Sequence, residues 1–391
     1  KYPDIPDVGA LYAESMMDLH PWDLYDKKTK QPREWTPEII SVLEHLIEIN
    51  KEHPGAHHFY IHAVEASANP ERGLESAGLL ESLVPGAGHL VHMPSHIYIN
   101  TGDYHLGTLS NKSAVNVDEE YVTACHAQGS YPLALFPHNY HFLAATATLE
   151  GNQSDAWMSA KKIRERTSVD IMKEPGWGTL QHYHSIPFYI AVKFAMWDTI
   201  LAMPVPEKDL VYPLAVSHYA RGMAWLGKNN VNRAETELAD LNKLAADSIL
   251  HTITIWDINS TYELMQIAVN VLEGEIAASK KMYEDAANFL MRAVEIEDNL
   301  NYDEPPDWFF SVRHNLGNVM LRAGKYVEAE RIYKEDLQTW KKNGWALYGL
   351  YISLVNQGKI SEAQQAKQQF ENAWQFADYK LDDVFDILVT K

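Results

Sequence analysis

The chain has 391 residues, of which 46% are hydrophobic, so it can bury a large core. Its formal net charge of −20 argues against nucleic acid and against an anionic membrane surface as partners. No run approaches roughly 18 consecutive apolar residues, which predicts a soluble protein without a membrane span. The single cysteine, Cys125, excludes an intrachain disulfide and a zinc site built on thiolates.

The first predicted element is a helical segment close to the N-terminus. The chain opens with KYPDIPDVGALYAESMMDL, at Lys1 rather than at a methionine, and this segment already has the pattern of a helical unit. We therefore expect an N-terminal segment to be missing, and with it any targeting signal. The compartment is left open on this basis.

Prolines predict four helix starts in the first half of the chain, because proline is favoured at the first helical position. The predicted helices begin after His53, Met93, Phe136 and Ile186 and run to about Ser67, Asn100, Glu150 and Ile200, respectively. Histidines gather at or just inside these helix starts. The partial positive charge of a helix N-terminus disfavours imidazolium, so we expect them to be neutral, which is the form that binds metal.

Thirteen of the 18 histidines lie between His53 and His184, in tight bunches. His58 and His62 are spaced i,i+4, and Glu65 extends the same helical face. Two imidazoles and a carboxylate at this spacing can meet one cation. This pattern predicts a site for zinc, iron or copper, and the residues do not distinguish among these three metals.

Further histidines are candidates for the same site. His92 and His96 are predicted as ligands, although Pro94 between them places His92 in an extended entry to the helix. His138 and His141, spaced i,i+3, are the candidate catalytic residues, because a spare imidazole can carry protons near a metal. Two other interpretations stay open: a histidine–tyrosine network that shapes a groove, and a polar pocket for an organic ligand.

The C-terminal part of the chain is repetitive. LRAGKYVEAERIY and LVNQGKISEAQQA align Gly324 with Gly358 and Ala329 with Ala363, each at an offset of 34 residues. This period, with glycine at the turn and a small residue where two helices cross, resembles the tetratricopeptide repeat. Fainter copies place Gly227 before Ala234, Gly151 before Ala156, and Gly102 before Gly107. We expect an all-α, tetratricopeptide-like α-solenoid of antiparallel helix pairs.

The motifs HPGAHHFYIH, from His53 to His62, and GHLVHMPSHIY, from Gly88 to Tyr98, resemble a family of bacterial tetratricopeptide-repeat proteins that is described by its fold. The resemblance covers roughly residues 3–200. It implies the fold, a bacterial cytoplasmic or periplasmic protein, and first helices that line a concave groove, but it implies no reaction. We divide the continuous solenoid into a histidine-rich half, 1–201, and a plainer repeat half, 202–391.

Two functions are consistent with this sequence. The first is a metalloprotein that holds the ion in its groove with His58, His62, Glu65, His92 and His96, as a metal-dependent hydrolase or oxidoreductase acting on a small molecule or peptide. The second is a non-enzymatic scaffold that binds a peptide or protein, with the histidines only shaping the groove. The absence of HExxH, GxxxxGK and GxSxG excludes three common catalytic motifs, and whether the protein is an enzyme stays open.

Overall fold

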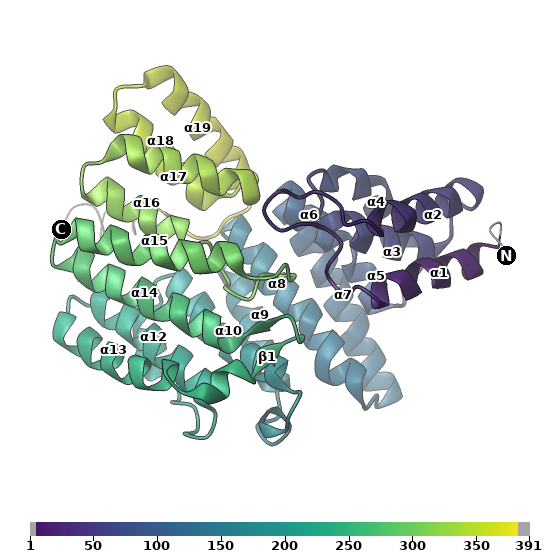
Figure 1. The fold of residues 1–391 in the computed structure, drawn as a ribbon, viewed down its shortest axis with the longest axis horizontal. Helices are drawn as coiled ribbons and strands as arrows, with labels where there is room; N and C mark the ends of the chain where they lie inside the picture. Colours follow the sequence, from purple (N-terminus) through teal and green to yellow (C-terminus); the bar gives the residue numbers. More distant parts are fainter. Residues whose placement is uncertain (1–4, 382–391) are drawn as a thin grey trace. The chain divides into compact units, whose positions relative to one another are not determined.

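The computed structural model describes residues 5–381, which form two compact units (Figure 1). Of the described residues, the first unit comprises 5–146 and 301–304, and the second comprises 147–300 and 305–381. The sequence-based division at residue 201 falls inside the second unit. No described helix is long and apolar enough to cross a membrane.

The first unit is a set of packed helices around an aliphatic core. Its elements are α1 (Pro6–Asp18), α2 (Thr36–Ile49), α3 (Pro54–Glu65), η1 (Pro70–Gly73), α4 (Leu74–Leu83), α5 (Gly88–His92), α6 (Pro94–Thr101), α7 (Tyr104–Cys125), the π-helical turn η2 (Tyr131–Leu135) and most of α8 (Phe136–Glu150). The helix α2 buries Ile39, Leu43 and Leu46 and packs against α3, which contributes Ile61, and Leu80 of α4 belongs to the same core. This packing fixes α3, which carries the first histidines.

The second unit contains the regular repeats. After the end of α8 come α9 (Gln153–Arg166), η3 (Ile171–Lys173), α10 (Gly178–Lys193), α11 (Trp197–Ala202), α12 (Val211–Gly227), α13 (Val231–Ala245), η4 (Ser248–His251), α14 (Thr261–Ser279), α15 (Tyr283–Asn299), α16 (Arg313–Arg322), α17 (Tyr326–Thr339), α18 (Gly344–Asn356) and α19 (Ile360–Ala373). A short antiparallel pair, β1 (Thr254–Ile255) and β2 (Asn259–Ser260), precedes α14.

Consecutive helices from α12 to α19 pack as pairs, and the first helices of successive pairs pack on one another (Figure 1). Gly324 and Gly358 adopt φ angles of 71° and 73° at the turns inside their pairs, a conformation that glycine adopts without strain. Ala329 and Ala363 are buried where the helices cross. The protein is therefore an all-α, tetratricopeptide-like α-solenoid, as the repeat pattern predicts.

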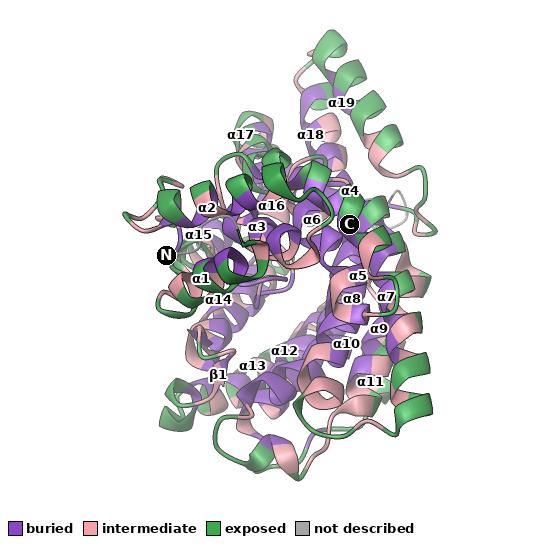
Figure 2. Cartoon of the chain, turned by 90° about the vertical axis from the view of Figure 1, so that its right-hand side faces the viewer, coloured by how far each residue is buried: buried purple, intermediate pink, exposed green. Residues whose placement is uncertain are grey.

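The helix α19, the last that the structure describes, has a largely polar surface. It buries only Ala363 and Ala366, and Figure 2 shows exposed residues along most of its length.

One predicted helix start is wrong. Pro187 lies inside α10, which begins at Gly178 and ends at Lys193, and the next helix, α11, begins only at Trp197. A proline in a helix interior costs about 3 kcal/mol. Most of α10 is buried, so its tertiary packing outweighs this local cost. His182 and His184 consequently lie within the helix instead of before it.

The small residue at Gly107 is a testable packing feature of the first unit. A methyl group at this position of α7 would lie 2.9 Å from Cγ2 of Thr146. We expect Gly107→Ala to lower the free energy of unfolding by about 1–2 kcal/mol, because α7 must move away from α8, which carries Thr146. Urea denaturation measures this change. The control is Gly78→Ala on the exposed face of α4, where no atom lies within 4 Å. There we expect a gain of about 0.5–1 kcal/mol, and a gain at Gly107 as well would contradict the prediction.

Candidate metal centre

Four helices of the first unit bring six imidazoles together. The residues are His58 and His62 on α3, His89 and His92 on α5, His96 on α6 and His138 on α8. Ring centroids are 4.8 to 5.1 Å apart at each step of the path His89, His58, His62, His96, His92, His138. We call these six residues and Glu65 the histidine cluster.

The path of the backbone through α5 and α6 differs from the sequence-based expectation. His92 is the last residue of α5, Met93 keeps helical angles (φ −50°, ψ −36°), and Pro94 is the first residue of α6. The amide of Met93 donates to the carbonyl of His89, so the chain stays helical up to the proline. The prediction of an extended entry at His92 is therefore wrong. His92 and His96 share one face, with 2.9 Å between their Nε2 atoms.

Glu65 lies between two of the imidazoles. Its Oε1 is 2.8 Å from Nδ1 of His62, and its Oε2 is 2.5 Å from Nδ1 of His96. The carboxylate is only 1% exposed. Burial acts to raise the pKa of Glu65, but the charges and hydrogen bonds of His96 and His62 outweigh it and hold that pKa well below its usual range. An ionised Glu65 accepts hydrogen bonds at both oxygens, so both histidines carry their hydrogen on Nδ1 and present a lone pair at Nε2.

Asn111 of α7 fixes the tautomer of His92 in the same way. Its Nδ2 donates to the carbonyl of Gly107 at 2.7 Å, so its Oδ1 is free to accept from Nδ1 of His92, also at 2.7 Å. The Nε2 of His92 therefore also carries a lone pair. Two lone pairs face each other at 2.9 Å between His92 and His96, an arrangement that is repulsive on its own and that a cation would stabilise.

The electrostatics of the histidine cluster favour neutral imidazoles. Burial, reinforced by the neighbouring imidazoles, lowers the pKa of His58, His92 and His138 well below the ordinary histidine value. The same causes lower the pKa of His89 to about 3. The pKa of His96 is also lowered by burial, although Glu65 opposes this effect. Neutral imidazole is the form that binds a metal ion.

The donor atoms fall into two groups of three imidazoles, each with its nitrogens within 4.8 Å of one another. We call His92, His96 and His138 the buried triad, because all three side chains are buried. His58, His62 and His89 form the partly exposed triad. Phe142 packs against the buried triad, with centroid distances of 4.4 to 5.1 Å to its three rings, and covers this side with an apolar surface.

All five residues predicted to bind the metal lie in the histidine cluster, but their roles differ. Glu65 uses both oxygens on imidazole Nδ1 atoms, which is the geometry of a group that orients ligands. For His89 the sequence leaves open a metal ligand or an ordinary turn residue, and the structure places its imidazole beside that of His58. His138 was assigned to proton transfer but belongs to a triad. His141 is buried one turn further along α8 and belongs to neither triad, and its catalytic role stays a prediction.

Other histidines in the bunches serve different contacts. His57 hydrogen-bonds Ser76 and the carbonyl of Lys51, and its ring lies outside both triads. In the second unit, His182 contacts the hydroxyl of Tyr212 at 2.8 Å.

A carboxyl group far away in the sequence also approaches the histidine cluster. Glu304 belongs to the first unit and is buried, with its Oε1 2.7 Å from Nδ2 of Asn100, a residue one turn beyond His96 on α6. Burial and the charge of Glu65 raise the pKa of Glu304 to about 8. Sequence reasoning missed this residue because no local spacing connects it with α6.

No protein-family model matches the sequence, and no curated protein matches it significantly. Among solved structures, the human IFIT1 dimer with m7Gppp-AAAA aligns over 95% of this chain and 72% of that chain, with 12% identity and a TM-score of 0.36. Yeast Tom70 aligns over 97% and 95%, with 11% identity and a TM-score of 0.29. The TPR domain of P58(IPK) aligns over 98% and 96%, with 12% identity and a TM-score of 0.27. At these values the likeness adds nothing about function, and the fold class follows from the helix pairs themselves.

Proposed function

We propose that this protein binds transition-metal ions in the histidine cluster, one ion at each triad. The observation that carries the proposal is the pair of facing Nε2 atoms of His92 and His96, 2.9 Å apart. Glu65 and Asn111 hold the hydrogens of these rings on Nδ1. Imidazoles oriented by a carboxylate or amide on their other nitrogen are typical of metal centres, because the partner fixes the ring and raises its basicity.

The donor set limits the kind of ion. Three neutral imidazoles suit zinc, copper or iron, whereas magnesium and calcium prefer oxygen ligands. Glu65 takes the role of the orienting group, and His138 is a ligand in this proposal rather than a proton carrier. The common carboxylate links His62 of one triad with His96 of the other, so the two ions would share one buried negative charge.

The two triads differ in their access to solvent, and this difference supports different roles for them. The buried triad is enclosed by Phe142 and favours a structural ion. The side chain of His62 in the other triad is 17% exposed, which leaves room for an open coordination position. A metal ion with three histidines and an open position can activate water or polarise a substrate carbonyl. We propose a hydrolase or oxidoreductase centre at this triad.

Metal stoichiometry tests the proposal. We expect tag-free full-length protein to bind two Co²⁺ ions, one for each triad, seen as saturable d–d absorption and by elemental analysis. His89→Ala and His138→Ala should each leave about one ion, because each removes one ligand from one triad. His141→Ala is the matched control for His138→Ala on the same helix and should still bind two.

The opposite result would support the alternative function, a non-enzymatic scaffold. Protein purified without chelators that takes up no stoichiometric Co²⁺, Zn²⁺ or Cu²⁺ would show that the imidazoles form a hydrogen-bonded network only. Equal uptake by the wild type and both triad variants would likewise rule out the histidine cluster as the binding site.

A further inference from the structure

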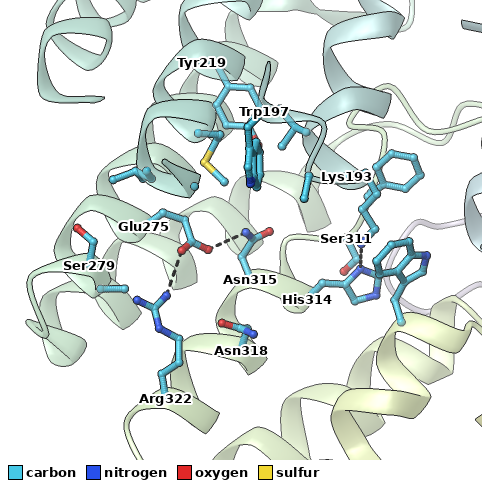
Figure 3. Close-up of a pocket in the computed structure, with 18 of the residues that line it drawn as sticks. Lys193, Trp197, Tyr219, Glu275, Ser279, Ser311, His314, Asn315, Asn318 and Arg322 are labelled. Carbon is cyan, nitrogen blue, oxygen red and sulfur yellow. Dashed lines mark hydrogen bonds and ion pairs between the residues drawn. The ribbon is translucent and has the colours of Figure 1, made fainter. Parts of the chain in front are cut away.

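A second candidate site lies in the second unit, apart from the histidine cluster. A cavity of about 320 Å³ opens among α10, α12, α14 and α16. Aromatic side chains line it (Trp197, Tyr219 and Trp308), and the ion pair of Glu275 with Arg322 forms a polar wall (Figure 3). Asn315 adds a hydrogen bond to Glu275 at 2.8 Å. An apolar cavity of this size with a few fixed polar groups suits a small organic ligand.

Lys193, at the end of α10, contributes an amine to the cavity wall. Its Nζ is 2.8 Å from Nδ1 of His314 (Figure 3). The same atom lies over the ring of Trp345, at 4.1 Å from its centroid. Lys173, in the same unit, forms its shortest contact with a carboxylate, 2.7 Å from Glu207. Lys193 is unusual because its hydrogen-bond partner is an imidazole.

The imidazole is itself oriented by an acid. Nε2 of His314 is 3.0 Å from Oδ2 of Asp336, and Nδ2 of Asn343 donates to the same oxygen at 3.0 Å. Asp336 is 1% exposed. The hydrogen of His314 therefore sits on Nε2, and the lone pair of Nδ1 points at the amine of Lys193. A nucleophile, a base within hydrogen-bond reach and a third group that orients the base form the arrangement of an activated nucleophile.

The surroundings of Lys193 also favour its neutral form. Burial lowers the pKa of Lys193 to about 7, although the charges of Asp336 and Glu297 act in the opposite direction. Burial likewise raises the pKa of Glu297 to about 8, so this acid is mostly neutral at pH 7 and opposes the shift only weakly. About half of the Lys193 side chains are then free amines near pH 7, where an ordinary lysine is almost wholly protonated.

We propose that this cavity binds a small aldehyde or ketone with an aromatic or apolar body, and that Lys193 forms a Schiff base with it. His314 accepts a proton from the ammonium group, and the free amine adds to the carbonyl carbon. The carbinolamine then loses its oxygen as water, taking up the second amine hydrogen. One C=N bond replaces one C=O bond, water is the only leaving group, and nothing is oxidised or reduced.

Reductive trapping tests the proposal on the full chain. The protein is incubated with benzaldehyde and cyanoborohydride at pH 7.4, and modified lysines are mapped by mass spectrometry. Lys281, which is exposed at the same cavity, is the internal comparison. We expect Lys193 to be modified at least about tenfold faster than Lys281, because burial enlarges the fraction of free amine at Lys193 and His314 lies within hydrogen-bond reach of it. Equal or slower modification of Lys193 would overturn the proposal.

A matched pair of variants tests the role of the base. His314→Gln keeps a donor for Asp336 but removes the basic nitrogen, and we expect it to slow the modification of Lys193 roughly tenfold. His218→Gln is the control, because His218 also contacts a carboxylate in this unit, Glu237 at 2.7 Å, but does not line the cavity. Thermal unfolding of both variants checks that they are folded. A His314→Gln rate equal to that of the control would overturn the proposal.

The pH dependence has a defined sign. A lowered amine pKa means that the reactive neutral form appears as the pH rises through about 7. The titratable groups that face Lys193 are His314, Asp336 and Glu297. We expect the trapping rate at Lys193 to rise between pH 6 and 8 and then level off. A rate at Lys193 that keeps rising well above pH 8, or saturable binding of benzoate without any trapping at Lys193, would overturn the Schiff-base proposal.

Discussion

Replacing His96 with alanine is expected to lower the free energy of unfolding of the metal-free protein by about 3–5 kcal/mol. The variant leaves Glu65, which is 1% exposed, without the imidazole that lies 2.5 Å from its Oε2. In the variant, the buried carboxylate of Glu65 still bears the free-energy cost of removal from water, with one hydrogen bond fewer to offset it. The missing ring adds the cost of a cavity beside Phe142. Urea denaturation followed by circular dichroism, with chelator present, measures the change.

The control for this variant is His45→Ala. His45 is an exposed histidine on α2 of the same unit, so we expect a change within about 0.5 kcal/mol. A loss below about 1 kcal/mol in His96→Ala would show that Glu65 does not depend on this imidazole. The same preparations, reloaded with metal, should have lost the ion of the buried triad.

Glu65→Gln is expected to weaken metal binding by at least about 10–100-fold while preserving the shape of the side chain. The glutamine amide can accept a hydrogen bond at its oxygen but must donate one at its nitrogen. The imidazole that faces this nitrogen, His62 or His96, then has to accept at Nδ1 and carries its hydrogen on Nε2. The Nε2 atom of that ring then has no lone pair available to bind the ion. Competition with a chromophoric chelator measures the affinity.

Glu44→Gln is the matched control for the affinity measurement. Glu44 is an exposed carboxylate on α2 that binds Tyr60 and Arg72 and has no contact with the imidazoles. It removes the same charge from the same unit without changing any tautomer. Equal affinities in Glu65→Gln and Glu44→Gln would mean that net charge alone controls metal uptake and that Glu65 has no orienting role.

The repeat architecture was predictable because its signals are local. The 34-residue offset between Gly324 and Gly358 marks equivalent turns, and both residues adopt the left-handed backbone that glycine tolerates. Ala329 and Ala363 mark where helices cross. The prediction failed at Pro187. Proline is favoured in the first turn of a helix, but the tertiary packing of α10 holds Pro187 in the interior of that helix.

The candidate site was predictable only in part. The i,i+4 spacing of His58 and His62 puts both rings on one face of α3, and this is a property of any α-helix. The contacts between α3, α5, α6 and α8 join residues up to 46 positions apart, such as His92 and His138, and no periodicity encodes them. For the same reason local spacing gives no sign of Asn111 or Glu304, whereas the i,i+3 spacing of His89 to His92 is a local signal.

The residues alone determine the helical class, the repeat, and which histidines share a helical turn, because helix geometry converts the spacing of residues in the sequence into the direction of their side chains. Tertiary packing decided which turns meet, and that choice depends on burial summed over distant segments. It brought Glu65 between His62 and His96, and it brought His314 to Lys193, a residue 121 positions earlier. It also affected the protonation of Lys193 and His96, since burial, which no local pattern records, lowers the pKa of both groups.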